Sequence, residues 1–94
     1  MENRFELTDF LNVKTIDSTT FELVSRFKAR RKEMKLSQSA LAKESNVSFA
    51  SLRRFEETGE ISLSSLIKLA NAMGMLGDFD KLFVTPKVKS IKDL

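Results

Sequence analysis

Between residues 18 and 35, apolar residues recur at every third or fourth position. The stripe consists of Leu23, Val24, Phe27 and Met34, with Arg31 as its one charged member. Such spacing places side chains on one face of an α-helix, and a serine or threonine commonly caps the first turn. We therefore predict a helix that is capped by Ser18 or Thr19, runs to about Lys35 and turns this stripe toward the core.

Two shorter helices are predicted next, over residues 38–45 and 49–57. Ser37 and Ser48 stand where each helix needs a capping side chain. Asn46 lies between the two helices, and asparagine tolerates the left-handed backbone conformation of a tight turn. The pattern of caps and turn predicts two helices joined by a short connection.

Small and apolar residues form the inner faces of these two helices. They are Leu41 and Ala42 in the first helix and Leu52 and Phe55 in the second. Ala42 matters because two helices that cross steeply after a turn of about three residues bring their backbones close together. A larger side chain would hold them apart, so the segment predicts a helix-turn-helix.

A fourth and a fifth helix complete the pattern. Ser62 can cap the fourth helix and Gly74 can end it. Its apolar side is predicted to comprise Leu63, Leu66, Ile67, Leu69, Ala70 and Met73, and the short fifth helix is centred on Phe79, Leu82 and Phe83. Because the 94 residues include only three glycines and a single proline near the end, we predict an all-α domain.

The chain divides into three parts in this interpretation. Residues 1–17 lack a helical period and are expected to form an extended or partly ordered arm, and residues 18–83 form one compact five-helix domain. Residues 84–94 form a short basic tail. The tail is either a disordered end or carries a short strand, Val88 to Ile91, that pairs with a second subunit.

Composition excludes several classes of protein. The chain has no Cys, His or Tyr and no Gly-rich loop, which removes most acid–base, nucleophilic and phosphate-cradling sites. Asp78 and Asp80 are interpreted as solvated carboxylates, so we expect no enzyme, no metal and no cofactor. No apolar run approaches the ~20 residues that span a bilayer, and the first residues are acidic. A cytoplasmic protein without a membrane partner is expected.

Positive charge is concentrated on the segment with the two short helices. Residues 21–57 contain nine Lys or Arg against five Asp or Glu, whereas residues 1–20 contain two against four. A basic patch of this kind is typical of a phosphate-binding face. The alternative is that these cations, Lys28 and Lys35 among them, form the solvated side of an amphipathic helix.

The segment 19–83 resembles the phage repressor and Cro-like family of DNA-binding domains, also called the XRE family. The resemblance rests on the two-helix motif with Arg31 before it and Glu56 after the second helix. It implies a lambda-repressor-like fold in which Arg31 and Glu56 form a buried ion pair. The chain departs from the family where Lys35 and Asn46 replace two glycines.

The resemblance also implies which side chains meet DNA. On the second motif helix, Phe49, Ala50, Arg53 and Arg54 point away from the buried side and fall at or beside positions that contact bases. Arginine matches the paired acceptors of guanine, and Phe or Ala can lie against the thymine methyl. We expect Arg53 or Arg54 to contact a guanine; for Phe49, packing against neighbouring helices is the alternative.

Phosphate contacts are predicted around this helix. Gln38 matches a family position that binds phosphate and supports the second motif helix. Ser48 and Ser51 can contribute hydroxyls or, for Ser48, helix-start amides. Lys28 and Lys35 complete the predicted phosphate contacts. The expected partner is double-stranded DNA, bound by a homodimer because two copies about one DNA turn (~34 Å) apart are needed for useful affinity.

A second hypothesis concerns a protein partner. The run from Ser51 to Phe83 is similar to small regulators encoded beside Hip-type kinase toxins. That similarity implies an antitoxin or adaptor that binds a toxin through surfaces away from the second motif helix. The two roles are compatible, and we rank a DNA-binding repressor first.

Overall fold

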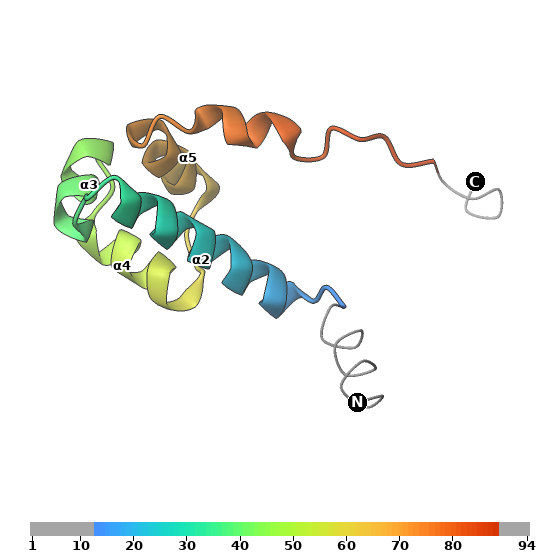
Figure 1. The fold of residues 1–94 in the computed structure, drawn as a ribbon, viewed down its shortest axis with the longest axis horizontal. Coiled ribbons are helices and arrows are strands. Elements are labelled where there is room, and N and C mark those ends of the chain that lie inside the picture. Colours follow the sequence, from blue (N-terminus) through green and yellow to red (C-terminus); the bar gives the residue numbers. More distant parts are fainter. Residues whose placement is uncertain (1–12, 89–94) are drawn as a thin grey trace.

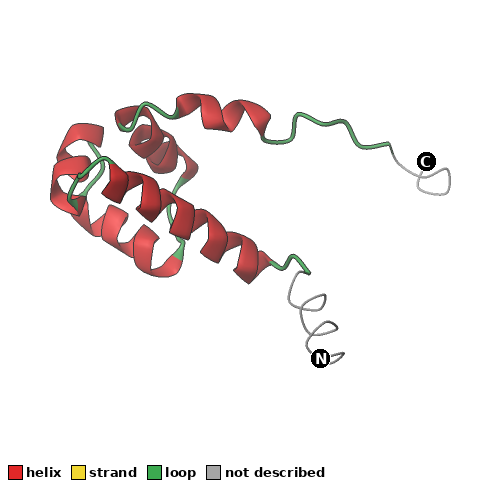
Figure 2. Cartoon of the chain, in the orientation of Figure 1, coloured by secondary structure: helices red, strands yellow, loops and turns green. Residues whose placement is uncertain are grey.

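The computed structural model describes residues 13–88, which form helices joined by short loops and contain no strand (Figures 1 and 2). The elements are α2 (Ile16–Glu33), α3 (Gln38–Ser45), α4 (Phe49–Thr58), α5 (Leu63–Ala72) and the 3-10 helix η1 (Leu76–Lys81). The predicted all-α, five-helix architecture is therefore confirmed. Over the same residues, no helix combines the length and the apolar character that crossing a membrane requires.

The first helix begins earlier than predicted. Thr15, not Ser18 or Thr19, is its N-cap: the Ser18 amide donates to Thr15 Oγ1 at 2.9 Å, and the Thr15 amide donates to Ser18 Oγ at 3.0 Å. This reciprocal arrangement satisfies two backbone donors at once. α2 thus starts within the segment assigned to the arm, whose residues 1–12 lie outside the described residues, as does most of the predicted strand Val88 to Ile91.

A short ion pair also stabilises the start of α2. Lys14 Nζ donates to Glu22 Oε1 at 2.7 Å. This hydrogen bond and the positive charge of Lys14 lower the pKa of the exposed Glu22 carboxyl below its ordinary value.

The apolar stripe of α2 is only partly buried. Val24 and Arg31 are buried and Phe27 packs against the core, as predicted, but Leu23 and Met34 are 41% and 45% exposed. Met34 is exposed because it is the C-cap residue at the end of the helix. Leu23 is exposed because α4 covers only one side of α2, and Leu23 faces an open groove on the other.

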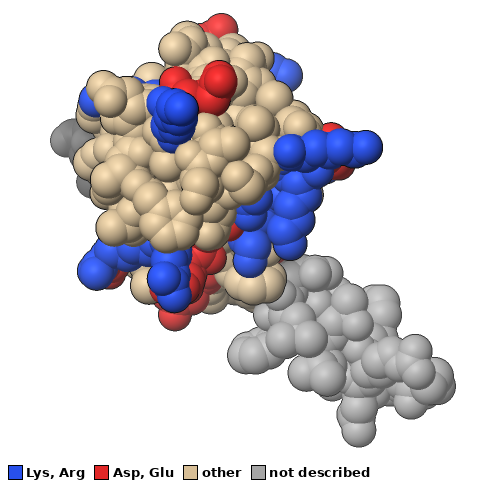
Figure 3. Space-filling model, turned by 90° about the vertical axis from the view of Figure 1, so that its left-hand side faces the viewer, with Lys and Arg blue, Asp and Glu red and all other residues tan. Residues whose placement is uncertain are grey.

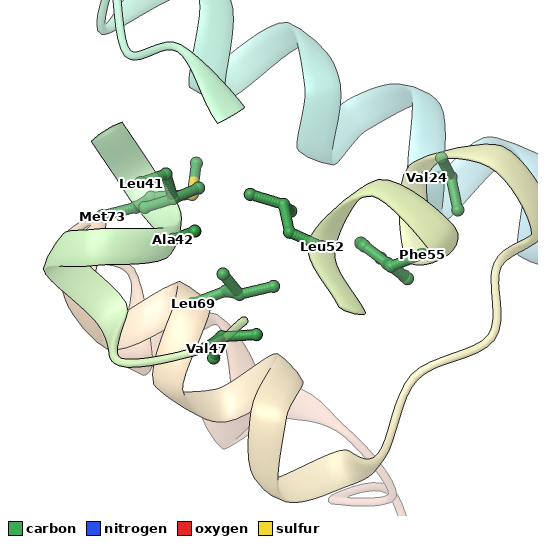
Figure 4. Close-up of a cluster of buried hydrophobic side chains, with 8 residues drawn as sticks. All are labelled: Val24, Leu41, Ala42, Val47, Leu52, Phe55, Leu69 and Met73. Atoms are coloured by element: carbon green, nitrogen blue, oxygen red, sulfur yellow. The ribbon is translucent and has the colours of Figure 1, made fainter. Parts of the chain in front are cut away.

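The core lies where α2, α3, α4 and α5 meet (Figure 4). Its members are Val24, Leu41, Ala42, Val47, Leu52, Phe55, Leu69 and Met73. The ring of Phe55 meets that of Phe27 edge to face, with centroids 5.1 Å apart, which adds a favourable aromatic contact to the burial of area. Ala42 is buried between the helices, as its small size predicts.

Residues with positive φ lie in each of four helix connections, and Gly74, with φ 72° between α5 and η1, ends the fourth helix as predicted. Asn46 has φ 61° and ends α3, as predicted, and Lys35 adopts φ 59° between α2 and α3 without being a glycine. Gly59 ends α4 with φ 82°, and a Cβ atom there would lie 2.2 Å from Thr20 Cγ2. Glycine is therefore required at position 59 for two reasons: the backbone is left-handed there, and α2 approaches too closely for a Cβ atom.

The C-terminal half leaves more apolar surface exposed than predicted. Ser62 caps α5, and Leu69, Ala70 and Met73 are buried, but Leu63 and Ile67 are exposed because no described element covers their side of α5. The helix predicted around Phe79, Leu82 and Phe83 is η1, which ends at Lys81, so Leu82 and Phe83 lie beyond it and are exposed. An apolar groove of about 550 Å³ opens between α2, α5 and η1, lined by residues that include Leu23, Phe27, Leu63, Leu66 and Phe79.

Candidate nucleic-acid interface

Helices α3 and α4 are joined by a tight turn that local hydrogen bonds define. The Ser37 hydroxyl accepts from the Ala40 amide at 3.0 Å and caps α3. At the other end of α3, the amides of Asn46 and Val47 both donate to the carbonyl oxygen of Ala42. The buried Val47 side chain anchors the turn in the core. These contacts confirm the helix-turn-helix and the predicted roles of Ser37 and Asn46.

α4 starts at a second serine cap. The Ser48 hydroxyl accepts from the Ser51 amide at 3.0 Å and donates to Ser51 Oγ at 2.9 Å. Ser48 therefore has the capping role that its position predicts. Because Ser48 Oγ already donates to Ser51 Oγ, a phosphate at this helix start would meet the free backbone amides and the hydroxyl hydrogen of Ser51.

A buried ion pair joins α2 to the far end of α4. Arg31 Nε donates to Glu56 Oε2 at 2.7 Å and Arg31 Nη2 donates to Glu56 Oε1 at 2.9 Å, with both side chains at least nine-tenths buried. Arg31 Nη1 also donates to the carbonyl oxygen of Leu36 at 2.8 Å. This bidentate contact is the pair that the family resemblance implies, and it fixes α4 against α2.

Gln38 adds a third partner to this pair. Its Nε2 donates to Glu56 Oε1 at 2.8 Å, which ties the start of α3 to the same carboxylate. This bond agrees with the support of the second motif helix that the family resemblance implies for Gln38, although the spacing of residues along the chain gives no signal that Glu56 is its partner. The amide of Gln38 thus supports α4 from the side.

The outer face of α4 carries the predicted base-contacting residues. Phe49 is 44% exposed, and Ala50, Arg53 and Arg54 are exposed as well, whereas Leu52 and Phe55 on the opposite side are buried. α4 therefore shows one face to solvent and is held rigidly by the other. The exposed ring of Phe49 favours an external contact over the packing alternative.

Both arginines have carboxylate partners that the sequence analysis missed. Arg53 Nε donates to Glu57 Oε2 at 3.1 Å, and Arg54 Nη2 donates to Glu60 Oε1. The spacing of four residues between Arg53 and Glu57 is a signal for the first pair, because residues four apart are neighbours on a helix. The second pair depends on the course of the chain after Gly59 and has no such signal.

The two predicted lysine contacts lie on α2 and in the connection that follows it. Lys28, on α2, lines a hollow with Glu56, Glu57 and Gly59, next to the end of α4. Lys35 is exposed in the connection between α2 and α3. Figure 3 shows the end of the molecule where α3 meets α4: Lys and Arg side chains lie mostly around its edge, and the middle is largely uncharged.

The segment that contains the two motif helices and the buried ion pair matches a known protein family. A family model described as helix-turn-helix matches residues 27–77, which is more than half of the chain. The match begins within α2 and ends in η1, so it covers the buried ion pair, the turn and all of α4. Neither the curated proteins nor the solved structures that were compared gave a match.

Proposed function

We propose that this chain, which belongs to the XRE-type helix-turn-helix family and is thus a DNA-binding transcription regulator, recognises a specific operator by placing α4 in the major groove. One observation carries the proposal. The exposed face of α4 presents Phe49, Ala50, Arg53 and Arg54, while its other face is fixed by Leu52, Phe55 and the Arg31–Glu56 pair. A rigid helix of this size fits the major groove, where each base pair shows a distinct pattern of donors and acceptors.

Each exposed residue of α4 has a role in this proposal. Arg53 or Arg54 donates to the O6 and N7 acceptors of a guanine, and Phe49 and Ala50 lie against thymine methyl groups. Phosphates are contacted by the backbone amides at the start of α4, which Ser48 caps, and by the side chains of Ser51, Gln38, Lys28 and Lys35. These contacts set the position of α4 on the duplex. Access to DNA requires an intracellular location, which is part of the proposal.

A salt titration tests DNA binding. A duplex is first selected from a random library by the protein itself, and its affinity is then measured by fluorescence anisotropy at several salt concentrations. The logarithm of the association constant should fall linearly with the logarithm of salt concentration. The double change Arg53→Ala and Arg54→Ala should weaken binding of the selected duplex, with a cost of about 1–3 kcal/mol for each lost bidentate contact to a base.

A matched control removes two charges elsewhere. Lys68 on α5 and Lys81 on η1 are exposed and lie outside the proposed interface. Changing both to Ala lowers the net charge as much as the arginine double change does, so operator affinity should fall only by a general electrostatic amount. If the two double variants lost the same affinity, sequence recognition by α4 would be refuted.

We infer that the regulator acts as a repressor and as a homodimer. Repression requires only that the operator is occupied.

Dimerisation is favoured by exposed apolar side chains around η1, namely Leu76, Leu82, Phe83 and Val84, of which Phe83 is 100% exposed. Sedimentation at micromolar concentration should show a dimer, and the double change Leu82→Ser and Phe83→Ser should give a monomer. A wild-type monomer that binds half-sites independently would contradict the dimer.

A protein partner is the second candidate function. The apolar groove between α2, α5 and η1 lies away from the outer face of α4, so a toxin-like protein could bind there while DNA is bound. Leu63 in this groove is 65% exposed, and Leu63→Asp should remove such a partner without changing operator affinity. If the α4 arginine variants keep full DNA binding while Leu63→Asp loses a co-purified protein, an adaptor function replaces the repressor.

A further inference from the structure

The two arginines on the outer face of α4 are held by their carboxylate partners through different nitrogen atoms. Arg53 uses Nε, the nitrogen nearest the helix, to bind Glu57. Arg54 uses Nη2, a nitrogen at the tip of the guanidinium, to bind Glu60. Both pairs are exposed, so the difference reflects the direction of each side chain and not burial.

This difference decides which guanidinium is ready to contact a base. Guanine presents O6 and N7 side by side, and a guanidinium matches them with a pair of N–H groups. Among the hydrogen bonds of residues 13–88, Nη1 and Nη2 of Arg53 take part in none, so the whole tip of Arg53 is available. Glu60 takes one N–H of the Arg54 tip, so its negative charge lies beside the end of the side chain that would approach the guanine acceptors and disfavours a base contact while the pair is closed.

Helix geometry explains why Glu57 can hold Arg53 in this way. Residues four positions apart lie above one another, about one turn of 5.4 Å along the axis. Phe49, Arg53 and Glu57 therefore form one row on the exposed face of α4, and Glu57 follows Arg53 toward the end of the helix. A bond to Nε restricts the swing of the long side chain while its tip stays open, which reduces the conformational entropy lost on binding.

We propose that Glu57 is a positioning residue that fixes Arg53 for contact with guanine, and that Glu60 is an internal counter-anion that keeps Arg54 from DNA until the pair opens. The inference rests on the proposed function, because it assumes that α4 enters the major groove. It assigns the base contact to Arg53, where the sequence alone left Arg53 and Arg54 as alternatives. It also predicts that removal of the two glutamates has different effects.

The experiment compares four single glutamate variants on one selected duplex: Glu57→Ala, Glu57→Gln, Glu60→Ala and, as a matched control, Glu33→Ala, which frees Arg30 on α2 from a similar exposed pair. Arg53→Ala, Arg54→Ala and the double change Arg53→Ala with Glu57→Ala are measured beside them. Each guanine of the duplex is replaced in turn by 7-deazaguanine, which lacks the N7 acceptor. The affinity for the duplex with guanine is divided by the affinity for the duplex with 7-deazaguanine, and this ratio is the guanine preference at that position. The affinity for an unrelated duplex measures general DNA binding. Far-ultraviolet circular dichroism verifies that each variant is folded.

Glu57→Ala should reduce the guanine preference at one position about three- to tenfold, the amount expected when a long side chain loses its fixed conformation. At that position Arg53→Ala should abolish the preference, and Glu57→Ala should then have no further effect. Glu57→Gln keeps an oxygen acceptor for Nε and should retain most of the preference. A role of Glu57 that depended only on its negative charge would not be rescued in this way.

Glu60→Ala should raise affinity for both duplexes about two- to fivefold, the range expected for release of an exposed ion pair and removal of a charge that repels phosphate. The guanine preference should stay unchanged. The inference is overturned if Glu57→Ala leaves the preference within twofold of the wild type, or if the preference depends on Arg54 and Glu60 instead. Both results would leave the proposed function intact, whereas a wild-type chain that binds no duplex would refute that function itself.

Discussion

The sharpest prediction of the fold concerns Glu56, whose carboxylate accepts hydrogen bonds from two separate elements. Its two oxygens take three donors, Nε and Nη2 of Arg31 and Nε2 of Gln38. The side chain of Glu56 is 3% exposed, so the carboxylate and its partners are shielded from water. Glu56→Ala therefore leaves a buried guanidinium with one remaining acceptor, the carbonyl oxygen of Leu36.

The expected loss of stability is large for so small a domain. Removal of one partner from a buried ion pair costs about 3–5 kcal/mol, because the remaining charge is uncompensated. The total free energy of unfolding of a typical domain is about 5–15 kcal/mol, so Glu56→Ala should remove a large share of it. Replacement of both partners by apolar residues, as in Arg31→Met with Glu56→Leu, leaves no buried charge and should cost far less than the two single changes together.

Urea unfolding monitored by circular dichroism measures these differences. The urea dependence of small domains is about 1 kcal/mol per molar, so the midpoint for Glu56→Ala should fall by about 3 M or more. The double-mutant cycle should give a coupling free energy of about 3 kcal/mol, near the upper limit for residues in direct contact. The wild type and the exposed-site variant Glu44→Ala are the controls, since Glu44 is exposed on α3.

Two outcomes would refute this reasoning. One is a loss below about 1 kcal/mol for Glu56→Ala, which is the value of an exposed pair and would mean that the pair is accessible to water. The other is an additive cycle, in which the double change costs as much as the sum of the two single changes.

The remaining predictions concern packing and backbone conformation, and thermal or urea unfolding measures all of them. Phe55→Ala should cost about 3–5 kcal/mol because Phe55 is 1% exposed, whereas Phe49→Ala on the same helix should cost less than about 1 kcal/mol; equal losses would contradict the assigned faces of α4. Gly59→Ala should destabilise by at least about 1 kcal/mol, since the new Cβ would lie 2.2 Å from Thr20 Cγ2 at a positive φ, and Thr20→Ser in the same chain should recover part of the loss. Lys35→Gly should stabilise the domain by about 1 kcal/mol because it relieves a left-handed conformation at φ 59°, and a destabilised variant would show that the Lys35 side chain makes a compensating contact.

Local features of the motif could be predicted from the sequence because each depends on residues close together in the chain. Ser37 and Ser48 cap the helices whose first turns they precede, and Asn46 adopts the left-handed conformation that its short polar side chain tolerates. The Arg31–Glu56 contact joins residues far apart in the chain and was reached through the family resemblance.

The spacing of apolar residues along the chain does not show which helices will lie next to one another. Features that depend on neighbouring elements could therefore not be predicted from it. Leu23 and Leu63 have the spacing of core residues, but the space between α2 and α5 is not filled by any described element, so both remain exposed. Thr15 was missed as a cap because a run of Ser and Thr offers several candidates, and only the reciprocal bond with Ser18 selects one. The contact of Arg54 with Glu60 requires the turn at Gly59, which spacing alone does not describe.

The most direct test of the central claim is to observe which amides respond when DNA binds. The uniformly ¹⁵N-labelled chain is titrated with its selected duplex, and chemical-shift changes are followed for residues 13–88. The account predicts that the largest changes fall on residues 48–54, at the start and along the exposed face of α4. Changes confined to α5, η1 and the groove beside Leu63, with α4 unaffected, would contradict it.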